Sequence, residues 1–296
     1  MSEQLVARAG SRSRTRTDPS IVDARANHAL PAVRPPQTVS LCGMSIARLD
    51  GAGLLDHVFA SLARGCGGWL ITANLDFVRR FARDPAVRAL YTKADLCVAD
   101  GMPIVWASRM RGEPLPERVT GSTLIWTLPE RAEREQRSLY LLGGEPGAAA
   151  GTAAAWARRW PGVRVVGCEA PHVSEPPTAG ELAAIRERVV RAAPDILLVG
   201  LGSPKQEMLI DALRADLPRC WMIGVGVSFS FAAGKTRRAP LWQQRAGLEW
   251  VHRMAQDPRR LARRYLIDDL PFAFVLFTDA LLGRSRRAAL GPSTAR

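Results

Sequence analysis

The stretch ADLCVADGMPIVWASRMRGEPLPERVTG, residues 94–121, decides the fold. Its short apolar run, Leu96 to Ala99, ends abruptly at Asp100 and Gly101 and is followed at once by helical spacing. This pattern predicts a buried strand that carries one carboxylate at its C-terminal end. In open α/β sheets ligands bind outside the carboxyl ends of the strands, and a glycine there lets a backbone or a ligand come close. Asp100 is therefore placed for chemistry, although it could also cap the next helix, and spacing alone favours the cap.

Strand-like and helix-like patterns alternate on both sides of this stretch. Short apolar runs predict strands at 39–44, 69–73, 96–99, 138–142, 163–166, 196–199 and 220–225, and segments with helical periodicity lie between them. Such alternation implies crossover connections and a mainly parallel sheet with helices on both faces. The predicted fold class is a doubly wound, Rossmann-like α/β sheet, extended by a C-terminal basic helical appendage.

Composition limits the partners of this chain. It has 296 residues and a formal net charge of +13, carried mostly by arginine, and 47% hydrophobic residues exclude wholesale disorder. The charge favours an anionic partner: a nucleic acid, a phosphorylated small molecule or an anionic membrane. The five cysteines contain no C-x-x-C pair, so neither a zinc site nor a disulfide framework is indicated. Three of them lie in apolar, strand-like runs and resemble small buried hydrophobic residues, so we expect a reducing, cytoplasmic location. The N-terminus lacks the long apolar stretch of a secretory signal.

Three segments follow from these patterns. We expect residues 1–36 to form a disordered basic tail, which is either a solvated extension or an RNA- or lipid-binding arm. We expect residues 37–240 to form the α/β core and residues 241–296 the basic appendage. In the appendage, Arg253, Arg260 and Arg264 would share one face if a single helix continued through Pro258. The apolar stretch 265–282 contains acidic residues that argue against a membrane span. It predicts a helix lying in the membrane interface or one packed on the core or on a partner, and the sequence leaves both open.

Three predicted strand ends are rich in glycine. They read LLGGEPG (141–147), VGLGSPKQE (199–207) and GVGVSFSFAAG (224–234). Exposed backbone N–H groups at such ends, backed by a helix N-terminus, can bind phosphate, but glycine is also common in these turns for geometry alone. Gln206 and Glu207 either face the same crevice as Asp100 or reflect an ordinary first-turn preference for acids. No stretch matches G-x-G-x-x-G, the Walker A pattern or D-x-D, so no cofactor or metal is expected. We therefore expect the arginines between 237 and 264 to balance the negative charge of a bound phosphate.

The motifs together resemble one known family. In chain order they read TANLDFV, ADLCVADGMPIVWASR, ERVTGSTL, LYLLGGEPG, PDILLVGLGSPKQE, GVGVSFSFAAG, RRAPLWQQRAGLEWVHR and DPRRLARRY. This order is similar to that of the WecG/TagA/CpsF family, glycosyltransferase family 26, over residues 38–266. The resemblance implies transfer of a sugar, with inversion and without metal, from a UDP-sugar donor to a polyprenyl-diphosphate-linked acceptor. It also implies a peripheral site on the inner face of the cell membrane, a role in exopolysaccharide or other cell-surface glycan synthesis, and possible homo-oligomers.

Functional residues carry over by position. The resemblance makes Asp100 the general base and Gln206 the contact to bound ligand. The complete set expected to bind substrate is Thr72, Asn74, Gly101, Gly143, Gly144, Gly202, Lys205, Gln206, Glu207, Arg237, Arg253, Arg260 and Arg264. The chain departs from the pattern at Ser230, where many members carry aspartate, and at 169–172, which replaces a Gly-Tyr pair. These departures leave the choice of donor and acceptor open.

Two other classes of protein would explain part of the sequence. A basic nucleic-acid-binding α/β protein without transferase activity would explain the net charge, but no RNA or DNA module is recognisable and the arginines gather toward the two termini. A nicotinamide-dependent oxidoreductase would explain the α/β alternation, but its fingerprint glycines are missing. We therefore expect a glycosyltransferase without a nucleic-acid partner.

Overall fold

Six parallel strands form the central sheet. The structure is a computed structural model that describes residues 34–290, apart from the side chains of Arg260, Arg284 and 286–290. The predicted N-terminal tail thus lies almost wholly outside the described residues. The strands follow the order β4-β3-β8-β7-β5-β6, and all neighbours are parallel. The predicted doubly wound α/β fold is confirmed. The strand bounds are Gly68–Ala73 (β3), Leu96–Ala99 (β4), Ser138–Gly143 (β5), Arg164–Glu169 (β6), Ile196–Gly200 (β7) and Trp221–Gly224 (β8).

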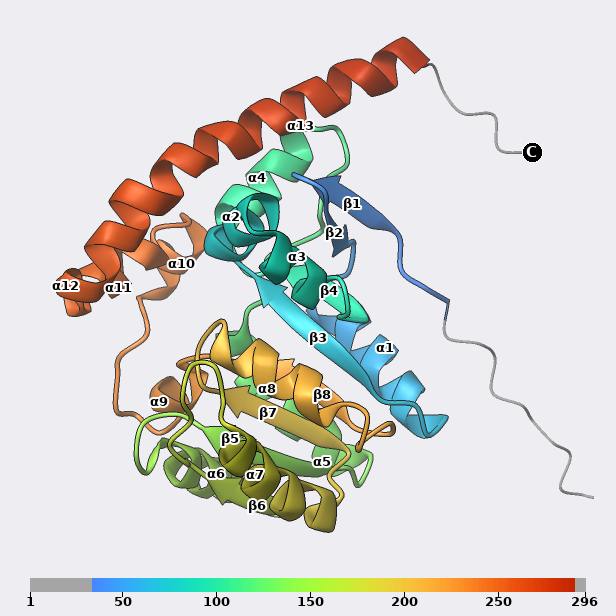
Figure 1. Cartoon of the computed structure of the whole chain (residues 1–296), viewed down its shortest axis with the longest axis vertical. Coiled ribbons are helices and arrows are strands. Elements are labelled where there is room, and N and C mark those ends of the chain that lie inside the picture. Colours follow the sequence, from blue (N-terminus) through green and yellow to red (C-terminus); the bar gives the residue numbers. More distant parts are fainter. Residues whose placement is uncertain (1–33, 291–296) are drawn as a thin grey trace, which may run out of the picture. The chain divides into compact units, whose positions relative to one another are not determined.

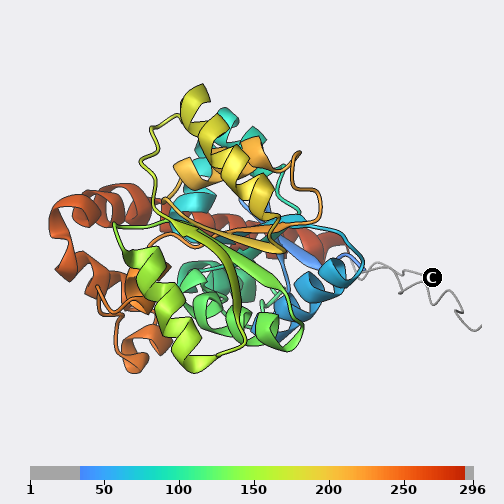
Figure 2. The same ribbon diagram turned by 90° about the horizontal axis from the view of Figure 1, so that it is seen from below.

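Helices cover both faces of this sheet (Figure 1, Figure 2). Their bounds are Gly51–Ala63 (α1), Leu75–Arg83 (α2), Pro85–Tyr91 (α3), Met102–Met110 (α4), Gly121–Arg134 (α5), Ala148–Arg159 (α6), Ala179–Ala192 (α7), Lys205–Leu213 (α8) and Ser228–Ala232 (α9). Ile185 of α7 and Leu209 of α8 are buried in the core on one face of the sheet. Leu54 of α1 and Trp156 of α6 are buried in a second core on the other face.

The strand order creates a crevice at the carboxyl ends of β3 and β8. These two strands are neighbours in the sheet. The helix after β3 packs into one core and the helix after β8 into the other, through Phe77 and Phe229 respectively. Connections that leave neighbouring strands toward opposite faces open a crevice, which is where ligands bind in open α/β sheets. Asp100, at the end of β4, lies beside this crevice.

The first predicted strand is a hairpin instead. The chain forms β1 (Thr38–Leu41), turns, and returns antiparallel as β2 (Met44–Ala47). Cys42 and Gly43 both have positive φ, +48° and +82°, and this conformation at two consecutive residues reverses the chain tightly. The prediction of one strand over 39–44 was wrong because both arms carry apolar residues, and only the turn separates them.

The C-terminal segment is a series of short helices followed by a long one. It consists of α10 (Leu241–Arg245), α11 (Glu249–Gln256), α12 (Pro258–Ala262), the π-helical segment η2 (Arg263–Asp269) and α13 (Leu270–Leu290). Gly247 has a φ of +75° and separates α10 from α11, so the helix predicted over 241–254 is interrupted. A second break at Asp257, before Pro258, means that no single helix aligns the appendage arginines.

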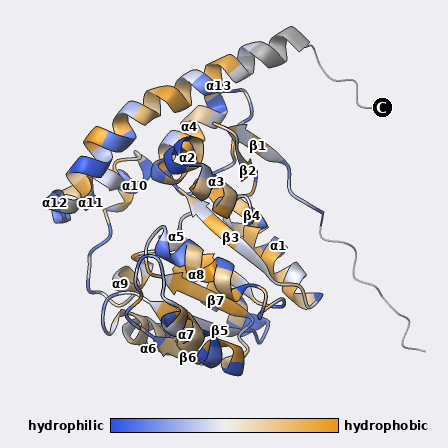
Figure 3. Cartoon of the chain, viewed as in Figure 1, coloured by the Kyte–Doolittle hydropathy of each residue, from blue (hydrophilic) through white to orange (hydrophobic). Residues whose placement is uncertain are grey.

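Helix α13 packs on the core with one face and exposes apolar residues on another. Phe272, Leu276 and Ala280 are buried in the same core as β1 and α4, and an oxygen of the Asp279 carboxylate accepts a hydrogen bond from the Cys42 N–H at 2.8 Å. Phe274 is 70% exposed. Figure 3 shows apolar turns along α13 next to the strongly hydrophilic region around α12. Packing on the core is thus confirmed, and in residues 34–290 no helix is long and apolar enough to cross a membrane.

Candidate active site

A cavity of about 290 Å³ opens at the carboxyl ends of β3 and β4. Its polar lining includes Asn74 and Asp100 at the two strand ends, Arg118 and Ser122 around the start of α5, and Glu249, Arg253, Arg264 and Asp269 of the C-terminal segment. Trp106, Trp250, Tyr265 and Phe277 supply apolar walls. The sequence-predicted residues Asn74, Asp100, Gly101, Arg253 and Arg264 are therefore brought together although 190 positions separate the first from the last. A cavity with apolar walls and a few convergent charges is typical of a ligand site.

Asp100 does not cap the helix that follows it. The N-cap of α4 is Gly101, which has no side chain to cap with, and the Asp100 Oδ2 atom lies 3.5 Å from the Gly121 N–H. Burial raises the pKa of Asp100 to about 7; Arg118 and Arg253 act to lower that pKa, and Glu249 acts to raise it. The capping interpretation that spacing favoured is wrong. The carboxyl group faces the cavity and changes charge near neutral pH, as a general base should.

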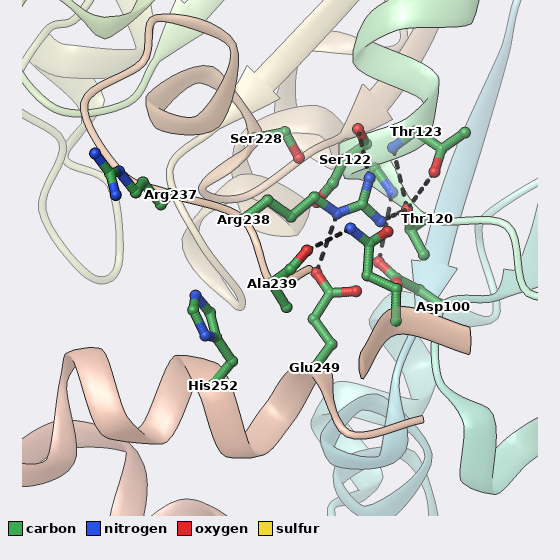
Figure 4. A network of polar contacts seen from close by, with 12 residues as sticks. Asp100, Thr120, Ser122, Thr123, Ser228, Arg237, Arg238, Ala239, Glu249 and His252 are labelled. Atoms are coloured by element: carbon green, nitrogen blue, oxygen red, sulfur yellow. Dashed lines mark hydrogen bonds and ion pairs between the residues drawn. The ribbon is translucent and has the colours of Figure 1, made fainter. Parts of the chain in front are cut away.

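Glu249 holds two arginines beside Asp100, and Figure 4 shows one of them, Arg238. Its two carboxylate oxygens accept from Arg118 Nη1 at 2.9 Å and from Arg238 Nε at 3.2 Å. Arg238 also donates to the Ser122 carbonyl and to the Thr120 hydroxyl, each at 3.2 Å. The neighbouring guanidinium groups outweigh the effect of burial and lower the pKa of Glu249. Sequence reasoning missed these residues, although the motifs ERVTGSTL and RRAPLWQQRAGLEWVHR contain them.

A second polar cluster ties the C-terminal segment to α2. Buried Asp76 pairs with Arg79, with Arg80 at 3.0 Å and with Arg264 at 3.4 Å. Arg264 also donates to the Asn74 Oδ1 atom at 3.3 Å, and this same oxygen caps α2 by accepting from the Phe77 N–H. Asp269 completes the cluster; burial first, and then the neighbouring Asp76 charge, raise the pKa of Asp269 to about 6. Arg264 is thus largely committed to holding the segment in place.

Four further predicted residues lie in β3 and at the start of α8, which follows β7. Gln206 accepts from the Gly226 N–H at 3.2 Å and donates to the Glu207 carboxylate at 2.7 Å. Glu207 is only 1% exposed, and burial raises its pKa to about 7. The Thr72 hydroxyl donates to the Gly224 carbonyl at 3.4 Å, and the Lys205 amine to the Val173 carbonyl at 3.1 Å. These side chains support the crevice from within.

Three glycines of the predicted set have backbone conformations that side chains rarely adopt. The φ angles of Gly143, Gly144 and Gly202 are +98°, +83° and +75°. A Cβ on Gly144 would also lie 3.2 Å from the Phe229 ring. The glycines are therefore required by the turns at the ends of β5 and β7, whether or not a ligand binds there.

The sequence matches one family of known proteins. The model of the glycosyl transferase WecG/TagA/CpsF family matches residues 39–286. The chain belongs to this family. It is similar to the N-acetylglucosaminyldiphosphoundecaprenol N-acetyl-beta-D-mannosaminyltransferase of Bacillus spizizenii, with 28% identity over 197 residues, which cover 67% of this chain and 74% of that protein.

Two predicted arginines and one departure from the family pattern remain in this glycosyltransferase. Arg237 is exposed, and Figure 4 shows its side chain pointing away from the Asp100 network. The side chain of Arg260 is not among those described. Ser230 is buried in α9, and the glycine-rich stretch 224–234 thus contains a helix rather than only a loop. In the described part of the chain, no three histidine, cysteine, aspartate or glutamate side chains gather as a metal site would require.

Proposed function

We propose that this glycosyltransferase moves a sugar from a UDP-sugar donor to a saccharide linked through diphosphate to a polyprenyl lipid, with inversion at the anomeric carbon. One observation carries the proposal: a carboxyl group with a pKa near 7, that of Asp100, faces a cavity lined by Arg118 and Arg253. The family match and the lipid-linked acceptor in the name of the Bacillus spizizenii relative support the same reaction class.

Asp100 is the general base in this mechanism. Its carboxylate accepts the proton of an acceptor hydroxyl while that oxygen attacks the anomeric carbon of the donor. The bond between the anomeric carbon and the diphosphate oxygen breaks on the opposite side, and its electron pair leaves with UDP. A base is most effective when its pKa lies near the working pH, and such catalysis contributes about 10²–10⁴ in rate.

Arginines and backbone groups stabilise the leaving diphosphate. Arg253 lines the cavity and pairs with no carboxylate of residues 34–290, so its charge is available for the developing negative charge. Charge-assisted hydrogen bonds from a guanidinium group to phosphate are strong, and they are stronger still in a cavity with apolar walls. A Cβ on Gly202 would meet nothing within 4 Å, so the turn at the end of β7 leaves open space, with Gln206 the expected ligand contact on that side.

The C-terminal segment supports a position on the inner face of the cell membrane. Phe274, 70% exposed, and Ile267, 66% exposed, form an apolar surface, and Arg259 and Arg263 are exposed nearby in sequence. Apolar residues flanked by basic ones suit the interface of an anionic membrane, where each basic residue contributes about 1 kcal/mol. A peripheral enzyme placed there would meet a lipid-linked acceptor directly.

The test is a transfer assay with the full-length chain. The acceptor is synthetic N-acetylglucosaminyl-diphosphate-polyprenol in vesicles, and a panel of UDP-sugars supplies the donors. We expect one UDP-sugar to be consumed, with UDP released and an extended lipid-linked product detected by mass spectrometry. Calorimetry with UDP, NAD and a short RNA serves as the binding control. Failure of every uridine nucleotide to bind, with vesicles present as well as absent, would overturn the proposal; tight RNA binding would favour the nucleic-acid alternative.

A further inference from the structure

A second groove, of about 320 Å³, lies beside the catalytic cavity. We propose that this groove binds the diphosphate of the acceptor lipid, separately from the site of the donor diphosphate. We name it the arginine groove, and it is lined by Arg109, Arg118 and Arg245 together with Met102, Val105 and Leu241. The inference rests on the proposed function and assigns a binding site to one of its two substrates.

The charge of the groove suits a diphosphate. The side chains of Arg109 and Arg245 are exposed, and neither forms an ion pair with a carboxylate of the described residues. The acidic residue of the groove is Glu117, one oxygen of which accepts from the Gly51 N–H at 2.6 Å and is thus directed to the start of α1. Unpaired guanidinium groups are the preferred partners of phosphate oxygens because each can donate two parallel hydrogen bonds.

The groove and the catalytic cavity share part of their lining. Met102 and Arg118 border both, so a ligand that reacts at Asp100 has a direct continuation into the groove. On its other side, Leu241 and Trp242 of α10 are 67% and 63% exposed, and they offer an apolar surface. The sugar, the diphosphate and the polyprenyl chain of the acceptor follow each other in the same order as cavity, groove and α10.

The cavity alone does not supply enough free positive charge for two diphosphates. Arg264 is shared among Asp76, Asp269 and Asn74, and Arg118 is held by Glu249. That leaves Arg253 as the cation of the cavity that pairs with no carboxylate in the described part of the chain. A donor and an acceptor that both carry a diphosphate would otherwise compete for it, whereas the arginine groove provides Arg109 and Arg245 for the second one.

The test uses the double variant Arg109→Gln/Arg245→Gln of the full-length chain. The probe is a short-chain, water-soluble N-acetylglucosaminyl-diphosphate-prenol, whose binding is measured by calorimetry without any bilayer. Because the loss of a charged hydrogen bond weakens binding about tenfold or more, we expect at least a tenfold weaker Kd for this probe and an unchanged Kd for UDP. The matched control Arg158→Gln/Arg191→Gln removes two exposed arginines from α6 and α7 and should change neither value.

A third variant acts in the opposite direction. Glu117→Gln keeps an oxygen for the Gly51 N–H but removes the negative charge from the groove, so the probe should bind more tightly. An unchanged Kd in the double variant overturns the inference. So does a defect that is seen only with anionic vesicles, because it would make the groove a phospholipid headgroup site.

The same experiment separates failure of the inference from failure of the proposed function. Wild-type protein that binds the probe through these arginines but transfers no sugar from any UDP-sugar would support the arginine groove as the acceptor site. It would refute the proposal that the donor is a UDP-sugar. Wild-type protein that transfers sugar while the double variant binds the probe normally would refute the groove alone.

Discussion

Replacing Asp100 with asparagine should separate catalysis from stability. Asparagine has nearly the same shape, but it is neutral and accepts no proton in the mechanism proposed above. We expect kcat to fall by about 10²–10⁴. The protein should nevertheless become more stable at neutral and alkaline pH, because the structure places the Asp100 carboxylate where burial disfavours its charge.

The size and sign of the stability effect follow from the pKa. Burial raises the pKa of Asp100 from 3.8 to about 7 in the folded protein, so between these values the folded protein binds more protons than the unfolded chain and stability falls as pH rises. A difference of about 3 pKa units corresponds to about 4 kcal/mol. Because Asp100 is only half-buried and lines an open cavity, the cost of its charge is smaller than this figure, and we expect a gain of about 1–2 kcal/mol for Asp100→Asn above pH 7 and none below about pH 4.

The assay combines urea denaturation at pH 4 and pH 8 with initial transfer rates from pH 5 to 9. For the wild type, log kcat/KM should rise with unit slope below about pH 7, as the base loses its proton. Asp84→Ala is the control, because the Asp84 carboxylate caps α3 by accepting from the Ala86 N–H at 2.8 Å. It should lose about 1 kcal/mol of stability and keep full activity. If Asp100→Asn behaved as this control does, the reasoning would be refuted.

Three further predictions concern the C-terminal segment and its contacts. Phe272→Ala removes a side chain that is 1% exposed and should lower the free energy of unfolding by about 3–5 kcal/mol. Phe274→Ala should change the free energy of unfolding by less than about 0.5 kcal/mol and should weaken binding to anionic vesicles. Equal melting temperatures for the two variants would contradict the packing of α13. Glu249→Gln removes a charge that raises the pKa of Asp100, so the acid limb of the pH–rate profile should move to lower pH, and an unmoved limb would count against the network. Asp76→Ala removes the buried carboxylate that three arginines share, and Arg79 and Arg264 keep only Asp269. It should cost about 3–5 kcal/mol in denaturation experiments, while a change below about 1 kcal/mol would show that the cluster is not structural.

Local patterns in the sequence were sufficient for most of the sheet. The strand predicted at 96–99 is β4 with the same bounds. An apolar run between turn residues can be recognised from neighbours a few positions away, so no tertiary contact was needed to find it. The position of Asp100 at a strand end, and hence at the ligand-binding edge, followed from the same pattern. The ordered motifs also indicated the family, which the match over residues 39–286 confirms.

The chemistry around Asp100 depends on contacts that no local pattern contains. Spacing favoured a helix cap, and only the backbone around Gly101 shows that the carboxylate is left to face the cavity. Glu249, 131 positions after Arg118, holds that arginine through an ion pair. The hairpin at Cys42 and Gly43 was hidden for a related reason, since positive φ is a property of the folded backbone.

The sequence by itself determined that the chain is a parallel α/β protein of the WecG/TagA/CpsF family with an acid at a strand end and a basic, apolar C-terminal segment. These properties depend on composition, on period and on the order of short motifs. Only the tertiary structure decided that Phe272 is buried and Phe274 exposed, that Arg264 is committed to Asp76, and that Arg109 and Arg245 line one groove. The physical reason is that burial and ion pairing arise between segments far apart in the chain, and they exist only once the sheet has brought those segments together.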